Sequence, residues 1–246
     1  MACAIERTWP RRPFKYGVFT RWSSNGGMLV TNMLMVRTVF ASGGTVGMAY
    51  YCAENEIGLL NLVDVPQVVA FPLAMLGIDF VMWFQHRLLH QFGFLWRAHQ
   101  VHHSDLDLTT ALRFHPFEAF FTVLMRLGAV AIFGTPILAV AAYEILLEAL
   151  DTLGHAAVRI PTRVDAVLRW VHVTPDYHRV HHSAAPEMNR NYALIFTLWD
   201  RLFGTYQAQP EKGHLKMKLG LPDRREAPTL HYFSLLLLPF RSMRQG

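Results

Sequence analysis

Histidine gives this sequence its chemical character. Two nearly identical hexapeptides, residues 99–104 (HQVHHS) and 178–183 (HRVHHS), each place imidazoles at relative positions i, i+3 and i+4. A pair with i, i+4 spacing precedes them. Residues at these spacings share one face of a helix. Neutral imidazole is the commonest protein ligand for iron, zinc and copper. The eight candidate ligands are His86, His90, His99, His102, His103, His178, His181 and His182.

This number of imidazoles exceeds what one metal ion uses, because a tetrahedral site takes about three or four protein ligands. The sequence therefore predicts two metal ions that share a histidine cage. The blocks are short, lie apart in the sequence and repeat one spacing. That arrangement argues against a soft histidine-rich tract for metal storage or transport.

A second group of polar residues lies within an otherwise apolar stretch. Glu144, Glu148, Asp151 and His155 follow one another at spacings of four, three and four, so they share a helical face. Ionisable residues inside a membrane are costly and mark functional sites. His155 is the ninth ligand candidate, and Asp151 could bind metal directly or through water. Glu144 and Glu148 would line a cavity or pair with Arg126.

The remaining candidates have weaker signals. Asp79 shares a helical face with His86 and is expected to accept the second ring N–H of a ligand histidine. His115 has three open roles: a metal ligand, a group that orients a ligand, or a residue that faces the substrate. His172 is expected to be structural. His214 and His231 lie in the polar tail and are expected to be solvated.

The apolar residues form long runs, as in membrane proteins. The chain has 246 residues, is 52% hydrophobic and has a mean hydropathy of +0.20. Runs 28–51 and 65–84 carry one charge each, and run 117–149 is divided by Gly134-Thr-Pro136, a turn signal. About 20 apolar residues cross a bilayer. The pattern predicts about four transmembrane helices, the last two as a hairpin.

The distribution of charge predicts the orientation. Five basic residues precede the first run, the loop 52–64 carries acidic residues and no basic one, and arginines follow the second and fourth runs. By the positive-inside rule, both termini and all histidine blocks face the cytoplasm. Orientation and anionic lipid headgroups explain the net charge of +5 better than nucleic acid does.

These observations predict an all-α membrane protein with a cytoplasmic, histidine-rich helical cap that holds a dimetal site. Residues 1–27 would be a basic cytoplasmic segment, 28–206 the membrane domain with its cap, and 207–246 a C-terminal tail. Residues 235–240 are apolar but too short to span, so an interfacial contact or a packing edge is expected.

The motifs together resemble the fatty acid hydroxylase/sterol desaturase superfamily of integral-membrane di-iron oxygenases. The resemblance extends over roughly residues 20–206, with the blocks in the order and spacing of that superfamily. It rests on residues 79–90, 95–104, 113–118, 155–161, 174–183, 191–192 and 199–206. It implies metal ligands at His86, His90, His99, His102, His103, His155, His178, His181 and His182. Asp151 stands where relatives often carry a histidine or an asparagine that holds a water.

The resemblance also implies the chemistry. Two iron ions, with zinc as a substitute in isolated protein, and O2 would hydroxylate or desaturate a C–H bond of a lipid such as a fatty acyl chain or sterol. Because the chain has two cysteines and no dinucleotide fingerprint, a separate cytochrome or ferredoxin with its reductase would supply electrons. An apolar cavity is expected beneath the metals, lined by the second to fourth spans.

Three alternatives remain open at this point. Within the superfamily, the chain could be a carotenoid hydroxylase or an ether-lipid monooxygenase. A membrane protein without redox chemistry could hold zinc in the same cage, although zinc commonly keeps four ligands. A metal transporter would need ligands through the membrane midplane, and only Glu144 and Glu148 favour that interpretation.

Overall fold

The structure, a computed structural model, describes residues 6, 8–12, 17–39, 43–63, 65–184, 186–221 and 231–241. Within these ranges the chain is helical and forms no β-strand. Extended segments meet only in isolated bridges, such as the one between His172 and Phe196. The prediction of an all-α protein is therefore confirmed for the described part of the chain.

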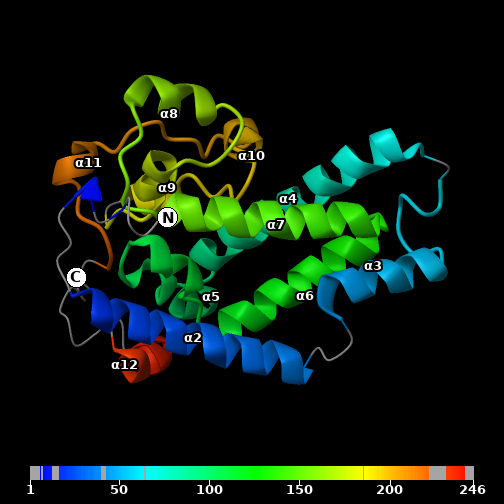
Figure 1. Ribbon diagram of the computed structural model, residues 1–246, viewed down its shortest axis with the longest axis horizontal. Coiled ribbons are helices and arrows are strands. Elements are labelled where there is room, and N and C mark those ends of the chain that lie inside the picture. Colours follow the sequence, from blue (N-terminus) through cyan, green and yellow to red (C-terminus); the bar gives the residue numbers. More distant parts are fainter. Residues whose placement is uncertain are drawn as a thin grey trace.

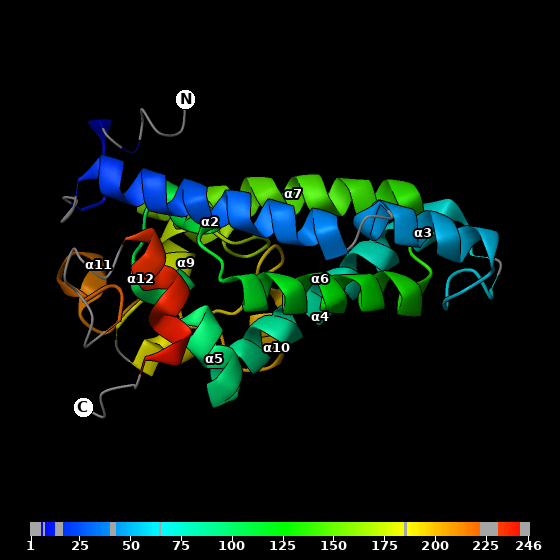
Figure 2. The same cartoon turned by 90° about the horizontal axis from the view of Figure 1, so that it is seen from below.

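Four long helices run side by side and give the molecule its elongated shape (Figures 1 and 2). They are α2 (Val18–Val39), α4 (Gln67–Gln91), α6 (Pro116–Phe133) and α7 (Ile137–His155). Helices α4 and α7 end where α2 and α6 begin, at one end of the molecule. Apolar side chains such as Ile78, Val130 and Tyr143 pack α4, α6 and α7 together.

Short helices form a cap at this end, and α3 (Gly44–Glu54) lies at the opposite end (Figure 1). The cap places the ends of α4 and α7 beside the two histidine hexapeptides. Its elements are α5 (Gly93–His99), η1 (His102–Ser104), η2 (Leu108–Leu112), α8 (Thr162–Leu168), α9 (Pro175–His181), η3 (Pro186–Asn189), α10 (Leu198–Leu202) and α11 (Gly213–Lys216).

The predicted turn between the last two apolar runs is confirmed. Gly134 ends α6 in the left-handed conformation, with φ of 63°, and Pro136 precedes the first residue of α7. A side chain at Gly134 would meet Ile57 O and Asn61, so glycine is also required by the close approach of the loop before α4. The turn makes α6 and α7 an antiparallel hairpin.

The first apolar run differs from the prediction of one continuous helix over 28–51. The structure divides it into α2 and α3, and Gly43 precedes α3 with φ of 89°. An L-residue rarely adopts this conformation, so the glycine pair marks a break in the run. Residues 40–42 lie outside the described part of the chain.

Two helices of the described residues are long and apolar enough to cross a membrane, α4 and α6. In α6 only 17% of the most apolar stretch is buried in the protein, and Phe117 and Ile132 are exposed. A large exposed apolar surface of this kind suits contact with lipid. The structure thus supports membrane association.

The apolar segment near the C-terminus is a packing edge. Leu235 in α12 (Tyr232–Leu237) and Leu238 in η5 (Leu238–Phe240) are buried against Met28 and Val101. The Tyr232 hydroxyl lies 2.6 Å from the Thr31 hydroxyl. This part of the tail therefore packs on α2 and on the cap, while Phe240 is exposed.

Candidate dimetal centre

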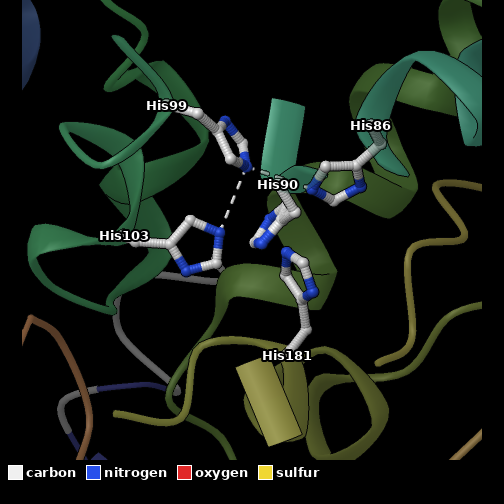
Figure 3. Close-up of side chains that lie close together, drawn as sticks. All are labelled: His86, His90, His99, His103 and His181. Atoms are coloured by element: carbon white, nitrogen blue, oxygen red, sulfur yellow. Dashed lines mark hydrogen bonds between the residues drawn. The ribbon is translucent and has the colours of Figure 1, made fainter. Parts of the chain in front are cut away.

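The cap and the ends of α4 and α7 bring all nine predicted histidines together in two adjoining clusters. One ring nitrogen of each residue lies within 4.8 Å of the others in its cluster. In Figure 3 the rings of the first cluster converge from α4, α5, η1 and α9. The first cluster is His86, His90, His99, His103 and His181, and the second is His102, His155, His178 and His182.

The two hexapeptides interleave between the clusters. Neighbouring residues His102 and His103 belong to different clusters, and so do His181 and His182. The rings of His103 and His182 stack across the boundary with centroids 4.5 Å apart. Each hexapeptide thus contributes to both clusters, which explains why one spacing occurs twice in the sequence.

Carbonyl acceptors fix the tautomers of three rings. His86 Nδ1 lies 2.8 Å from Tyr192 O, His155 Nδ1 lies 2.7 Å from Asp151 O, and His181 Nδ1 lies 2.8 Å from Arg190 O. Because a carbonyl oxygen only accepts, each of these Nδ1 atoms carries the proton and each Nε2 presents a lone pair. The ring of His99 is held by Glu118, whose Oε1 lies 2.6 Å from His99 Nδ1.

The Nε2 atoms converge within each cluster. His86 Nε2 lies 3.2 Å from His99 Nε2 in the first cluster, and His155 Nε2 lies 3.0 Å from both His102 Nε2 and His178 Nε2 in the second. His181 Nε2, His102 Nδ1 and His178 Nδ1 are buried and make no hydrogen bond, and a buried unpaired nitrogen is unfavourable. Convergent imidazole nitrogens with unpaired positions are a donor set that fits a metal ion in each cluster.

Burial also keeps the cap histidines in the form that binds metal. Loss of solvation lowers the pKa of His102, His103 and His182 well below its ordinary value. The charge that neighbouring rings would carry lowers these pKa values further. The imidazoles are consequently neutral at pH 7, as ligation requires.

A cavity of about 120 Å³ adjoins both clusters. His86 and His99 of the first cluster and His102 and His178 of the second line it, together with residues of α4, α6 and α7. Its position agrees with the expected cavity beneath the metals. Its lining differs from the expectation of an apolar cavity, because it includes Arg126 and several carboxylates in addition to apolar residues such as Met82 and Leu147.

The acidic residues of α7 line the cavity and pair with Arg126, the two roles predicted for them. Glu144 and Glu148 line the cavity, and Glu144 Oε2 is 2.6 Å from the Arg126 guanidinium. Asp151 belongs to neither cluster. It also lines the cavity, and its backbone oxygen orients His155.

Asp79 does not accept from a histidine ring, contrary to the prediction. Its carboxylate accepts from Tyr143 OH at 3.2 Å, Trp199 Nε1 at 2.9 Å and Phe196 N at 3.1 Å. Asp79 is fully buried and ties α4 to the segment that follows Tyr192. Its donors come from α7, from Phe196 and from Trp199 of α10, so Asp79 holds these segments to α4.

The structure gives His115 a capping role and corrects the prediction that His214 is solvated. His115 belongs to neither cluster. It caps α6: its Nδ1 accepts from Phe117 N, and its Nε2 lies 3.2 Å from Leu236 O. His214 is buried rather than solvated, with its Nε2 3.0 Å from Gln209 Oε1. His231 is exposed, as expected.

Glu118 is the residue at the site that sequence reasoning missed. It lies in the first turn of α6, is 2% exposed, and its Oε1 lies 2.6 Å from His99 Nδ1. The sequence 113–118 could have indicated Glu118. A carboxylate three residues after His115, in the first turn of a helix, lies on the same side of the helix as the cap residue. Its partner, His99, lies 19 positions earlier, and no local spacing in the sequence links the two residues.

We predict that Glu118→Gln weakens metal binding by about 10- to 100-fold, because an amide oxygen is a weaker acceptor for the His99 N–H than a carboxylate. Competition against a chelator of known affinity measures the change. Glu54→Gln, at an exposed position at the end of α3, is the matched control. An unchanged metal affinity in Glu118→Gln would show that this hydrogen bond does not support ligation.

Comparisons with known proteins agree with the geometry. Residues 71–205 match the sequence model of the family described as fatty acid hydroxylase. The alkylglycerol monooxygenases of Xenopus tropicalis and Homo sapiens are both 33% identical over 150 residues, covering 57% and 56% of this chain and 31% of each relative. The ornithine lipid hydroxylase OlsE of Rhizobium tropici is 29% identical over 148 residues, covering 59% of this chain and 44% of the relative.

The matched region thus spans less than half the length of each of these relatives. No solved structure matches the chain significantly. The family match includes most of α4, all of α6 and α7, seven of the short helical segments that surround them, and all nine clustered histidines. It covers more than half of the chain, and the chain belongs to the fatty acid hydroxylase family.

Proposed function

We propose that the protein is a membrane-bound, O2-dependent di-iron oxidoreductase that oxidises a C–H bond of a lipid. The observation that carries this proposal is the pair of buried histidine clusters that open on one cavity between apolar helices. For hydroxylation, the C–H bond, O2, two electrons and two protons give an alcohol and water. Loss of a second hydrogen in place of hydroxylation would give an alkene.

The nine clustered histidines would hold the metal, five at one ion and four at the other. Zinc commonly keeps about four ligands and has no redox chemistry. A set of nine imidazoles suits two ions of higher coordination number, which favours iron. Bound iron would supply the O2 chemistry. The chain would orient the imidazoles through Tyr192, Arg190, Asp151 and Glu118, and would keep water from the buried centre.

The substrate would be a lipid, because relatives that share the family motifs are named for lipids. A specific candidate is an ether lipid, since the alkylglycerol monooxygenases are 33% identical to this chain. The named ornithine lipid hydroxylase favours hydroxylation over desaturation.

The topology is part of the proposal. Four spans would be formed by α2 with α3, by α4, by α6 and by α7, with the cap and both termini in the cytoplasm. The arginine-rich cap and the acidic loop 52–64 support this orientation. Residues 28–206 would form the membrane domain with its cap, between the basic segment 1–27 and the tail 207–246. A separate cytochrome or ferredoxin with its reductase would dock on the basic cytoplasmic face.

Metal content and O2 uptake test the function together. Protein purified in mild detergent is loaded anaerobically with Fe(II) and given a chemical or protein reductant and a lipid extract. Two irons per chain and lipid-dependent O2 uptake are expected. Two tightly held zinc ions, with no O2 uptake after replacement by iron, would contradict the redox proposal and favour a zinc protein.

A further inference from the structure

A hollow with basic walls lies at the outer end of the cap, and none of the clustered histidines lines it. Its volume is about 500 Å³, within the range of small-molecule sites. Figures 1 and 2 show α11, which forms one wall, at the end of the molecule opposite α3. The polar side chains that line the hollow are Arg11, Arg159, Lys212, His214 and Lys216.

Segments that are distant in the sequence bring these cations together. An antiparallel bridge between Pro10 and Val158 places the segment of Arg11 beside that of Arg159. The two lysines come from the residue before α11 and from its last residue. Like charges gathered around one space repel each other unless an opposite charge enters it. The arrangement therefore favours an anionic ligand.

The hollow lacks acids that would balance this charge. No aspartate or glutamate of the described residues lines it, and none pairs with Arg159 or with the two lysines. Asp176 lies 2.9 Å from Arg11 Nη2, but it also pairs with Arg179, so two arginines already balance its charge. An excess of positive charge in a concave site raises the local concentration of anions.

The walls also contain buried polar atoms without partners. His214 is 7% exposed, and its Nδ1 makes no hydrogen bond. Arg11 Nε is likewise buried and unpaired. Buried unpaired groups are unfavourable. A phosphate oxygen would accept from Arg11 Nε, and a ring nitrogen can pair with a phosphate oxygen or with a ligand hydroxyl, depending on the tautomer.

We propose that this hollow binds the phosphate group of a phosphorylated small molecule. Guanidinium and ammonium donors from three sides suit a phosphate, which has more acceptor oxygens than a carboxylate has. The space exceeds that of a phosphate alone, and Pro10 and Leu215 form an apolar wall for the rest of the ligand. The phosphate could belong to a soluble molecule or to a lipid head group. The position at the end of the cap favours the soluble source.

A bound ligand would also stabilise the cap. Arg11 joins the hollow to α9 through Asp176, and α9 carries His178 and His181 of the two clusters. The ligand would link the N-terminal segment, the segment after α7 and α11. Binding to the folded protein alone raises its stability by mass action. The site is separate from the metal centre, and the inference does not depend on the proposed function.

Equilibrium binding of adenosine monophosphate tests the site, with adenosine as the probe that lacks the phosphate. The zinc-loaded protein is held in nanodiscs of phosphatidylcholine, and no turnover is required. The nucleotide should bind at least about tenfold more tightly than adenosine and, when saturating, raise the melting temperature by about 5 °C. Inorganic phosphate should displace it, whereas chloride at equal ionic strength should not.

Charge reversals identify the hollow as the place of binding. Arg159→Glu and Lys212→Glu, both at exposed positions, should each weaken nucleotide binding about tenfold. Arg163→Glu, at an exposed arginine of α8 outside the hollow, is the matched control and should change it less than about twofold. Zinc content and the melting temperature without ligand check that each variant is folded.

Nanodiscs that contain phosphatidic acid distinguish the two sources of phosphate. Unchanged nucleotide binding there is expected for a soluble ligand. Loss of binding that inorganic phosphate in solution does not reverse would overturn the soluble source and assign the hollow to a lipid head group. Equal affinity for the nucleotide and adenosine, or nucleotide binding that both glutamate variants leave intact, would overturn the phosphate site itself. None of these results bears on O2 uptake, so the proposed oxygenase function is tested separately.

Discussion

Replacing both His178 and His182 by alanine is expected to leave one metal ion per chain in place of two and to abolish lipid oxidation. Both residues belong to the second cluster, which would keep only two imidazoles. Two nitrogen ligands cannot hold an ion as four do, since each ligand contributes to affinity. The first cluster has five histidines and loses none, so it should still bind metal.

The mirror experiment removes His103 and His181 from the first cluster. Three imidazoles would remain there against four in the second, so the expected stoichiometry is one firmly held ion and one weakened ion. Elemental analysis after gel filtration gives the number of ions, and O2 uptake gives the activity. His231→Ala, at an exposed site outside both clusters, is the control. Loss of both ions in either double variant would contradict two separately occupied sites.

The clustered histidines could be predicted from sequence because their spacing is local. His178, His181 and His182 lie within five residues, and a helical turn alone brings them to one side. The stripe of α7 is likewise a periodic pattern in one helix. The division into a cluster of five and a cluster of four could not be predicted. The adjacent histidines of each hexapeptide belong to different clusters, and the spacing within a hexapeptide does not indicate this.

The partners of the buried carboxylates could not be predicted either. Asp79 meets Trp199 across 120 positions of the chain, and His99 meets Glu118 only because α5 packs beside α6. Position relative to His86 suggested that Asp79 binds a ring, but a buried carboxylate takes whichever donors the fold brings near. Burial of His214 depends in the same way on packing between segments. Long-range contacts of this kind leave no periodic signal in one sequence.

The break in the first apolar run was present in the sequence as a glycine pair. Hydrophobic composition alone favours one span over 28–51, and the composition continues through Gly43. Gly43, the residue before α3, has φ of 89°, a conformation that glycine adopts readily and other residues rarely adopt. The beginning of α3 therefore follows from the conformational freedom of this glycine. Composition therefore indicates that a segment is apolar without determining where its helices end.

Asp200→Ala should lower the melting temperature by about 10 °C, the largest stability effect expected outside the clusters. Asp200 is fully buried, and its carboxylate accepts from Trp83 Nε1, Tyr192 N and Ala193 N at 2.7–3.0 Å. The Tyr177 hydroxyl also donates to it. Alanine would leave all these donors buried without an acceptor, at a cost of about 3–5 kcal/mol in total.

The effect should extend to the metal centre, because Asp200 holds the backbone of Tyr192, whose carbonyl orients His86. Metal affinity should therefore fall in Asp200→Ala although no clustered histidine has changed. Thermal unfolding in mild detergent, with and without metal, measures both effects, and Glu211→Ala at an exposed position is the control. A melting temperature within about 2 °C of the wild type, equivalent to less than about 1 kcal/mol, would show that this carboxylate does not hold the cap to α4. Full stability with weakened metal binding would instead confine its role to the orientation of His86.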